Sequence, residues 1–450
     1  MKRIRILAAA LATALVCSGC QIGDVANQLR APRPTGEQRA IQAALDSYIA
    51  RSGGSREYIL KYPQDGDYMS AFVMEDIDAD DEEEAVAFYQ FTGEGEPTHI
   101  HLLDKQDGKW QSVSDLEGFS ADISGVAFGD LDGDGIRELL AGWSLYNSRD
   151  RQLGVYSLAG ETITAVSDDQ YYTKLVVTDF ITPGKDDLLL FQLDTAQNTA
   201  VVRLKSLTEI GLTERGQAPI DGYIRSFGDY CIGKLADGLH GVYIDGYKDA
   251  GTTITELIYW DGNGLRTPFY NEYDFITSLT ARQTAIPCMD IDGPGDRDSR
   301  VEWPSCTRLP GYEEETTADA MWLTEWKSWQ YETQSAERLF ASIVNTADRY
   351  YLVVPDAWLD ESANAWGGTV TADYASSTHL LRLFAYKEER ADHPFLTIRV
   401  GAADDGDDEP GEALEIVDAD GNRIRYRITY DETYGLDREQ VQYLLRPLRG

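Results

Sequence analysis

The sequence predicts a mainly β protein, in which a β-propeller-like repeat domain of five to seven blades precedes a small C-terminal α+β domain. Three observations lead to this prediction. One segment recurs five times along the middle of the chain, alternating apolar stretches flank each copy, and the recurrence stops after Trp329, where a different strand pattern begins. A recurrence at a period of about fifty residues is typical of repeat architectures, in which each copy forms one structural unit.

The five copies align on one polar residue that follows an alternating apolar stretch. These residues are 54, 49, 55 and 56 positions apart along the chain: Asp76, Asp130, Asp179, Lys234 and Asp290. Each copy has one predicted strand before the turn and one after it, and further strand-turn-strand segments complete the unit. Four strands in each unit is the composition of a propeller blade. A predicted strand at residues 58–61 is a candidate to complete the final blade.

A predicted amphipathic helix precedes the repeats, at residues 35–54. Its apolar residues recur at helical spacing: Ile41, Ala44, Leu45, Tyr48 and Ile49. Two glycines end the helix, and we expect it to pack on the repeat domain, residues 55–335. The C-terminal α+β domain is predicted at residues 345–450, where several strand patterns are followed by a short capped helix.

The chain begins with a segment typical of export signals. Positive charges at residues 2–5 precede an apolar run at residues 6–16, which is too short to span a bilayer, and the small residues before Cys20 follow. This ending resembles the lipobox of bacterial lipoproteins, although Cys17 stands where that family usually has leucine. An ordinary secretory signal is the alternative.

The lipobox resemblance implies three features of the mature protein. Residues 1–19 would be a lipoprotein signal peptide, and Cys20 would become the lipidated N-terminus. Residues 20–34 contain two prolines and no periodicity, which predicts a tether between the anchor and the folded body. The expected location is extracytoplasmic, with the lipid on Cys20 anchoring the chain to a bacterial membrane.

The second copy contains the sharpest chemical motif, a run of acidic residues at alternate positions. Its sequence is DLDGDGIRE from Asp130, and the first copy repeats the arrangement as DIDADDEEE from Asp76. Calcium takes several oxygen ligands, and alternate side chains of such a loop converge on one point while a later carboxylate closes the shell. An EF-hand would need an acidic residue at the twelfth position, where these copies have Ala141 and Ala87.

A strand, a DxDxDGxxE loop and a second strand at this period resemble the FG-GAP or VCBS family of calcium-binding propeller repeats. The resemblance implies one structural calcium ion in each of two loops. The implied ligands are Asp130, Asp132, Asp134, the Ile136 carbonyl and Glu138 in one loop, and Asp76, Asp78, Asp80, the Glu82 carbonyl and Glu84 in the other. The alternative is a pair of solvated acidic turns without metal, which the mutual repulsion of clustered carboxylates disfavours.

The other three copies depart from this motif. The third keeps only its first and ninth positions, as Asp179 and Asp187. The fifth keeps the first, third and ninth positions, as Asp290, Asp292 and Asp298. The fourth begins with Lys234, which places a cation where the first ligand of the metal should be. We therefore expect two calcium sites and at most a weak third.

Three cysteines and two histidines are further candidates for chemistry. Cys288 and Cys306 could close a disulfide within one repeat and leave Cys231 unpaired, and three buried thiols are the alternative. His99 and His101 share one face of a predicted strand and could ligate a transition metal. The chain has five histidines and no third candidate near this pair, so we expect the two side chains to face solvent.

Charge and motifs narrow the classes of function. With 77 acidic against 40 basic side chains the net charge is -37, which excludes nucleic acid as a partner. No HExxH or GxSxG signature is present in the sequence. The leading hypothesis is a non-enzymatic, lipid-anchored binding or adhesion protein that recognises an extracellular protein or glycan. The alternatives are a glycoside hydrolase or lyase on a propeller scaffold and a structural component of the envelope.

Overall fold

The structure, a computed structural model, describes most of the chain after residue 35. The described residues are 36–52, 56–158, 162–293, 299–312, 321–401, 411–418 and 421–448. The predicted signal peptide, the predicted tether and Cys20 all lie outside the described residues. Within the described ranges, no helix combines the length and the apolar character that crossing a membrane requires.

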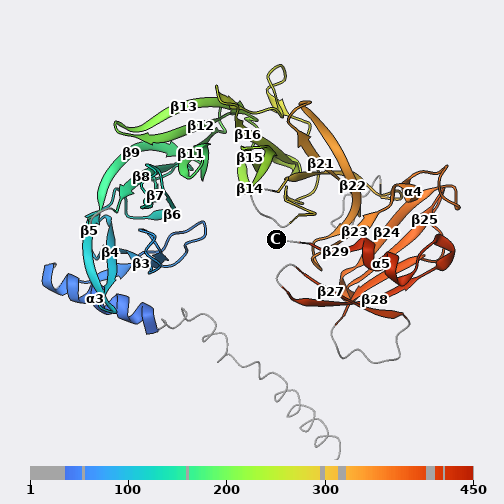
Figure 1. The fold of residues 1–450 in the computed structure, drawn as a ribbon, viewed down its shortest axis with the longest axis horizontal. Coiled ribbons are helices and arrows are strands. Elements are labelled where there is room, and N and C mark those ends of the chain that lie inside the picture. Colours follow the sequence, from blue (N-terminus) through green and yellow to red (C-terminus); the bar gives the residue numbers. More distant parts are fainter. Residues whose placement is uncertain are drawn as a thin grey trace, which may run out of the picture. The chain divides into compact units, whose positions relative to one another are not determined.

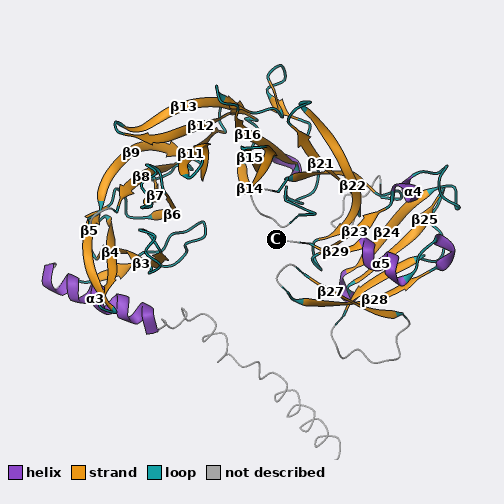
Figure 2. Ribbon diagram, viewed as in Figure 1, coloured by secondary structure: helices purple, strands orange, loops and turns teal. Residues whose placement is uncertain are grey.

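The chain forms two compact units, which we describe in turn. The first contains residues up to 126 together with 157–164, and the second contains residues 127–156 and 165 onwards. Strands dominate the described residues, as Figure 2 shows. The α-helices are α3 (Gly36–Ser52), α4 (Asp356–Leu359) and α5 (Arg438–Leu444). The prediction of a mainly β protein is therefore confirmed.

The first unit is built on one antiparallel sheet with the order β1-β3-β4-β5, and β2 also pairs with β3. Its strands are β1 (Tyr58–Leu60), β2 (Phe72–Glu75), β3 (Glu84–Phe91), β4 (Thr98–Gln106) and β5 (Lys109–Glu117). β1 and β2 lie along the same edge of β3, because β1 pairs with its C-terminal half and β2 with its N-terminal half. The strand predicted at residues 58–61 thus belongs to the first sheet, and the expectation that it completes the final blade is wrong, because it pairs with β3.

Helix α3 packs on this first sheet through its apolar stripe. Its buried residues are Ile41, Leu45 and Ile49, which recur every four positions and therefore share one face. They form a core with Phe72, Tyr89, Leu103 and other residues of the sheet. The predicted helix and its packing are confirmed for residues 36–52, whereas residues 35, 53 and 54 of the predicted range lie outside the described residues.

Four further sheets follow in chain order, and Figure 1 shows those of the second unit succeeding one another. The second sheet contains β6 (Ile123–Gly129), β7 (Glu138–Ser144), β8 (Arg151–Ser157) and β9 (Thr164–Tyr172). The third contains β10 (Lys174–Thr182), β11 (Lys185–Asp194), β12 (Thr199–Thr208) and β13 (Gly211–Ile220). In both, each strand pairs with the next along the chain.

The fourth and fifth sheets continue this arrangement. The fourth contains β14 (Ser226–Ala236), β15 (Leu239–Tyr247), β16 (Thr253–Trp260) and β17 (Leu265–Arg266), and a hairpin of β18 (Tyr270–Asn271) and β19 (Ile276–Thr277) follows it. The fifth contains β20 (Glu302–Arg308), β21 (Trp322–Gln330), β22 (Ser335–Asn345), β23 (Tyr350–Val354) and β29 (Leu445–Pro447). β29 pairs with β23, although ninety residues separate them in sequence.

Successive sheets of the second unit share hydrophobic cores. Leu188 and Leu190 of β11 join a core with the second sheet, whereas Leu189 and Phe191 join a core with the fourth. Neighbouring residues of a strand point to opposite faces, so each inner sheet is buried on both sides. Sequential meandering sheets packed face to face are the arrangement of propeller blades, which confirms a β-propeller-like repeat domain.

Each of the five sequence copies coincides with one hairpin of its sheet, which in the first sheet is formed by β2 and β3. Each aligned residue lies at or near the end of the first strand, and the second strand follows the turn. In the fifth copy the first strand is reduced to a single bridge between Met289 and Glu302. The period read from the sequence is therefore the period of the sheets.

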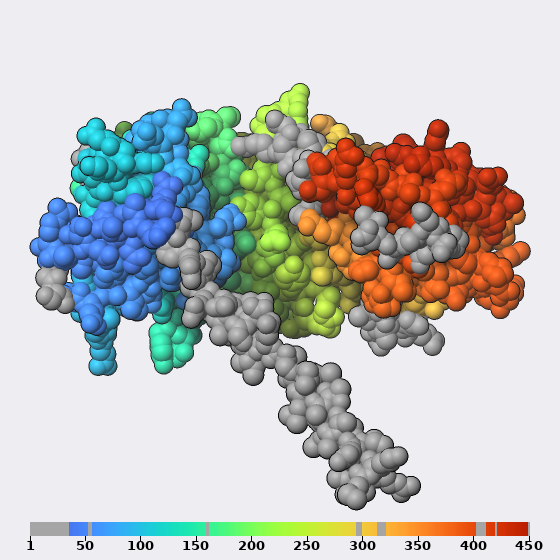
Figure 3. All heavy atoms as spheres, turned by 90° about the horizontal axis from the view of Figure 1, so that it is seen from below, coloured from blue at the N-terminus to red at the C-terminus, as the bar shows by residue number. Residues whose placement is uncertain are grey.

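The C-terminal sheet is not separate from the fifth sheet. Its order is β24-β25-β26-β28-β27, with β24 (Thr369–Ala375), β25 (Leu380–Tyr386), β26 (Leu396–Val400), β27 (Glu412–Val417) and β28 (Arg423–Tyr430). One core contains Ile343 and Leu352 of the fifth sheet together with Leu383 and Ile428 of the C-terminal sheet. In Figure 3 the orange and red atoms of these segments form one continuous block. The boundary predicted at 335–345 coincides with β22, which the fifth sheet uses.

Candidate metal centres

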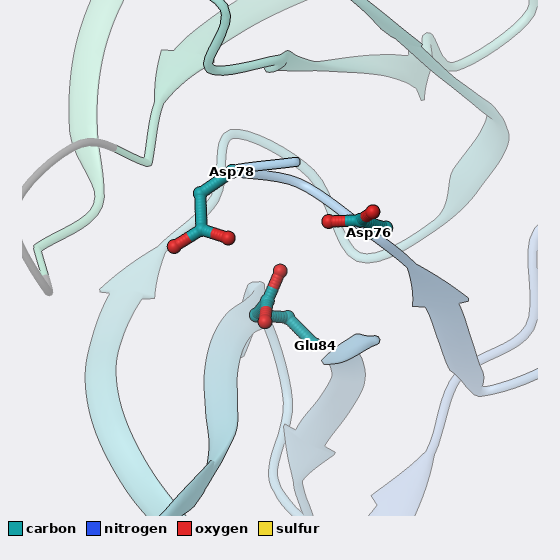
Figure 4. Close-up of side chains that lie close together, drawn as sticks. All are labelled: Asp76, Asp78 and Glu84. Carbon is teal, nitrogen blue, oxygen red and sulfur yellow. The ribbon is translucent and has the colours of Figure 1, made fainter. Parts of the chain in front are cut away.

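The first loop, residues 76–84, joins β2 to β3. Asp76 follows β2 directly, and Glu84 is the first residue of β3. One carboxylate oxygen from each of Asp76, Asp78 and Glu84 lies within 4.8 Å of the other two. Figure 4 shows these three carboxylates turned toward a common point. We call this arrangement a carboxylate triad. Glu84 Oε2 accepts a hydrogen bond of 2.9 Å from the Ile77 N–H, which holds the side chain in the loop.

The second loop, residues 130–138, joins β6 to β7 and contains the same triad. Oxygens of Asp130, Asp132 and Glu138 lie within 4.8 Å of one another. Glu138 Oε2 accepts from the Leu131 N–H at 2.9 Å, the equivalent of the bond in the first loop. The neighbouring hairpin of the third sheet supports this loop, because the Asp130 N–H donates to Asp186 Oδ2 at 3.0 Å and the Asp130 carbonyl accepts from the Asp186 N–H at 2.8 Å.

A third triad lies in the fifth copy, formed by Asp290, Asp292 and Glu302. Glu302 Oε2 accepts from the Ile291 N–H at 3.2 Å, so the closing glutamate again bonds the residue after the first aspartate. The sequence alignment placed Asp298 in the closing position, and Asp298 lies outside the described residues. The structure brings Glu302 there instead, because this loop is four residues longer than the other two before its second strand begins.

The third and fourth copies show why the motif fails in their sheets. Asp187 lies opposite Thr178 in the pairing of β10 with β11, as Glu84 lies opposite Glu75 in the pairing of β2 with β3. Asp187 is therefore the equivalent of the closing glutamate. Its carboxylate accepts from the Ile181 N–H at 2.9 Å and from the Ser206 hydroxyl, so protein donors satisfy it. In the fourth copy Gly241 takes the equivalent place, opposite Gly233. The β10–β11 and β14–β15 hairpins each turn within two residues. Such a short turn has no loop that could present the second aspartate of a triad.

All three closing glutamates are buried, with exposed fractions of 8% for Glu84, 2% for Glu138 and 1% for Glu302. Burial raises the pKa of Glu84 and of Glu138 to about 7, and that of Glu302 to about 8. The backbone N–H bond lowers each pKa, and nearby aspartates raise it. A bound cation would oppose both the burial and the repulsion, since it favours the charged carboxylate.

The donor set of each triad fits a hard divalent cation. Its atoms are carboxylate oxygens with no nitrogen or sulfur among them, which suits calcium better than zinc or copper. Calcium prefers six to eight oxygen ligands, so backbone carbonyls, other loop carboxylates or water would complete the shell. Asp76, Asp78 and Glu84 would hold an ion in the first loop, and Asp130, Asp132 and Glu138 in the second.

The remaining predicted ligands do not belong to the triads. The Asp80 carboxylate accepts from the Glu82 N–H at 2.8 Å, and the Asp134 carboxylate accepts from the Ile136 N–H at 2.8 Å. Both aspartates lie close enough to raise the pKa of the closing glutamate of their own loop. Coordination by Asp80 and Asp134, and by the carbonyls of Glu82 and Ile136, stays a prediction.

Both loops use left-handed backbone at the same two places. In the second loop these are the fourth and sixth positions, Gly133 at a φ of 83° and Gly135 at 91°. In the first loop the same positions are Ala79 at 59° and Asp81 at 71°. The Asp130 carboxylate accepts from the Gly133 and Gly135 N–H groups at 2.7 and 3.0 Å. The loop shape thus depends on a conformation that glycine adopts most easily.

One histidine is buried and the other is mostly covered, so the expectation that they face solvent is wrong. His101 is fully buried, and the side chain of His99 is 14% exposed. Both Nδ1 atoms contact the Asp115 carboxylate, at 2.9 Å from His99 and 3.0 Å from His101, and the Tyr89 hydroxyl donates to it at 2.9 Å. The period-two alternation of β4 placed them on one face correctly, but helix α3 covers that face.

Comparisons with known proteins leave the family of this chain undetermined. No family model matches the chain, and no curated protein matches it. Among solved structures, the propeller of Dos1 has a TM-score of 0.31 and 9% identity, over 71% of this chain and 64% of that chain. Proteins of Bacteroides fragilis and Bacteroides uniformis assigned as 6-phosphogluconolactonases have TM-scores of 0.31, with 11% and 12% identity.

These two Bacteroides alignments cover 75% and 76% of this chain, and 92% and 93% of the other chains. TM-scores this low carry no argument about relationship or activity. The fold assignment accordingly rests on the strand pairing and the shared cores of the molecule itself.

Proposed function

We propose that this chain is an extracytoplasmic, lipid-anchored binding protein, in which calcium stabilises a propeller of the FG-GAP or VCBS type that recognises a protein or a glycan. One observation carries the proposal, the recurrence of the carboxylate triad with the same glutamate-to-backbone hydrogen bond on three different sheets. Recurrence at one place in the repeat favours a structural role, since each triad lies in the turn that leads into a strand and its glutamate is the first residue of that strand.

The carboxylates of each triad have two roles, since they hydrogen-bond to the loop backbone and would bind the ion. The first aspartate binds the loop backbone, as Asp130 does toward Gly133 and Gly135. The closing glutamate ties the loop to the buried residue that follows that aspartate, Leu131 in the second loop. Calcium, when bound, supplies the positive charge that lets these carboxylates stay ionised side by side.

The lipid anchor and the binding role depend on sequence features beyond the triads. The charged start, the apolar run and Cys20 support export and lipidation. Several large side chains on loops of the second unit are exposed and offer contact groups to a partner: Tyr146 at 94%, Tyr273 at 92% and Phe275 at 66%. A net charge of -37 favours partners that are neutral or basic.

Thermal melting in EDTA and in graded calcium tests the metal part of the proposal. We expect the melting temperature to rise with calcium, and Glu84→Gln and Glu138→Gln each to weaken the rise. Glu82→Gln is the matched control, because it makes the same chemical change on an exposed side chain of the first loop and keeps the carbonyl that is predicted to bind. A calcium response that is equal in all four proteins would overturn the loop assignment.

Binding is tested with purified protein on a glycan array and by pull-down from detergent-solubilised envelopes, both with calcium present. Retention of one glycan class or one stoichiometric protein, lost in EDTA, supports the proposal. Turnover of a glycan that is abolished by one carboxylate substitution outside the triads would replace it with an enzymatic function. Release of the protein from membranes by Cys20→Ser is the expected result if Cys20 carries the lipid.

A further inference from the structure

Cys231 and Cys288 meet between the fourth and fifth sheets, although 57 residues separate them in sequence. Cys231 lies in β14, directly opposite Tyr243 of β15. Cys288 precedes Met289, which bridges to the first residue of β20. Cys231 Sγ lies 3.5 Å from the Cys288 carbonyl oxygen.

The surrounding structure holds both cysteines in place. Cys288 is 3% exposed and belongs to a core with Tyr243 and Trp303, and Cys231 packs against the same core. The Cys288 N–H donates to Asp245 Oδ2 at 3.0 Å, and Asp245 lies two residues along β15 from Tyr243. Residues of β15 therefore contact both cysteines.

Cys306, which the sequence spacing suggested as the partner of Cys288, has different neighbours. Its sulfur lies 3.2 Å from the Thr284 hydroxyl and 3.7 Å from the Thr324 hydroxyl. It packs against a core around Trp326 in which Cys288 has no part. The structure thus places Cys231, and not Cys306, beside Cys288.

We propose that Cys231 and Cys288 form a disulfide that joins β14 of the fourth sheet to the segment leading into the fifth. The oxidant is a disulfide, either that of a thiol oxidoreductase or a small-molecule disulfide. The proposal is independent of calcium and of any binding partner. It requires only that the folded chain meets such an oxidant, as exported proteins do.

The reaction has two exchange steps. The Cys231 thiolate attacks one sulfur of the oxidant, which forms a mixed disulfide and expels the first thiolate. Cys288 then loses its proton and attacks the Cys231 sulfur, which forms the new bond and expels the second thiolate. Two electrons pass from the cysteines to the oxidant, and the two cysteine protons end on the two released thiols.

The environments of the two thiols favour this order. Cys231 is only partly buried, so an oxidant reaches it, whereas Cys288 is accessible only to its neighbour. The more exposed sulfur is therefore the better first nucleophile.

Peptide mapping of the full chain after treatment with oxidised glutathione tests the pairing directly. Free thiols are first alkylated, and the protein is then cleaved with trypsin without reductant. Cleavage after Arg225, Lys234, Arg282 and Arg300 puts the three cysteines on separate peptides. A linked pair containing Cys231 and Cys288 is the expected product. A pair containing Cys288 and Cys306, or glutathione retained on Cys231 with Cys288 alkylated, would overturn the proposal.

Melting under oxidising and reducing conditions gives a second readout. Reduction is expected to lower the melting temperature of the wild type by about 5 °C, because the open chain regains entropy over a long loop. Cys306→Ser, the matched control, should show the same drop, whereas Cys231→Ser and Cys288→Ala should show none. A drop that disappears in Cys306→Ser and persists in Cys231→Ser would contradict the assignment.

Discussion

The first and second loops present the same carboxylate triad but reach it through different backbones. The second loop has glycine at both left-handed positions, and the Asp130 carboxylate accepts loop N–H groups at 2.7 and 3.0 Å. The first has Ala79 and Asp81 there, and the Asp76 carboxylate accepts loop N–H groups at 3.2 and 3.3 Å. Acidic spacing alone therefore does not rank two sites, because the residues between the ligands determine how much strain the loop contains.

The largest expected effect is on calcium binding. The loop of the second site is formed with less backbone strain and is supported by Asp186, so this site should bind calcium more tightly than the first. Glu138→Gln should therefore remove more of the calcium-dependent stabilisation than Glu84→Gln. At a free calcium concentration a hundred times its Kd, one site adds about 2.7 kcal/mol to the free energy of unfolding. Titration calorimetry of the two variants measures the site that each retains. Tighter binding in Glu138→Gln than in Glu84→Gln would reverse this ranking.

A second difference lies in the first sheet, where the partly buried Asp115 of β5 contacts two histidines. Burial tends to raise its pKa, but hydrogen bonds from His101 and His99 outweigh this and lower it to about 2. Because the folded-state pKa lies below the ordinary value of 3.8, the stability it contributes is present above pH 3.8 and is lost as the pH falls toward 2.

We therefore expect Asp115→Asn to reduce the free energy of unfolding by roughly 2 kcal/mol at pH 6 and to have little effect at pH 2. Denaturant melts in EDTA at several pH values measure the difference without interference from metal. Glu117→Gln, on the same strand, is the control for a change of charge. A loss of stability that is independent of pH would show that Asn fails for steric reasons alone.

The left-handed positions of the second loop give a smaller effect. Gly135→Ala should destabilise the protein by roughly 1 to 2 kcal/mol, because an alanine Cβ meets the following carbonyl at this φ. A Cβ at Gly135 would have nothing else within 4 Å, so the backbone conformation is the cause. Chemical denaturation measures the loss. Gly36→Ala is the control, since it adds the same methyl group in open space without a positive φ.

The converse substitution in the first loop gives the smallest effect. Ala79→Gly should raise the free energy of unfolding by less than about 1 kcal/mol. Glycine relieves the left-handed strain in the folded state, but its greater conformational entropy stabilises the unfolded chain and offsets most of that gain. The same variant should bind calcium more tightly at the first loop. Calorimetry of Ala79→Gly in the Glu138→Gln background isolates that site, and weaker binding there would mean that the strain is not what separates the loops.

The two loops were predictable because their acidic residues and the closing glutamate stand at constant spacing. The third triad was missed at Glu302, since a longer loop moved the glutamate out of alignment and Asp298 offered an acidic residue at the expected place. Periodicity predicted that His99 and His101 share a face, but no local pattern revealed that α3 covers that face. The approach of Cys231 to Cys288 depends on how two sheets pack, which spacing along the chain does not encode.

The pairing of β29 with β23 has a consequence for the order in which the chain acquires its structure. Residues 445–447 form an edge of the fifth sheet, and Leu445 lies in the core that this sheet shares with the C-terminal sheet. During synthesis the first four sheets can close as they leave the ribosome, because their strands are consecutive. The fifth must wait with an open edge and an incomplete core until about ninety further residues have been translated.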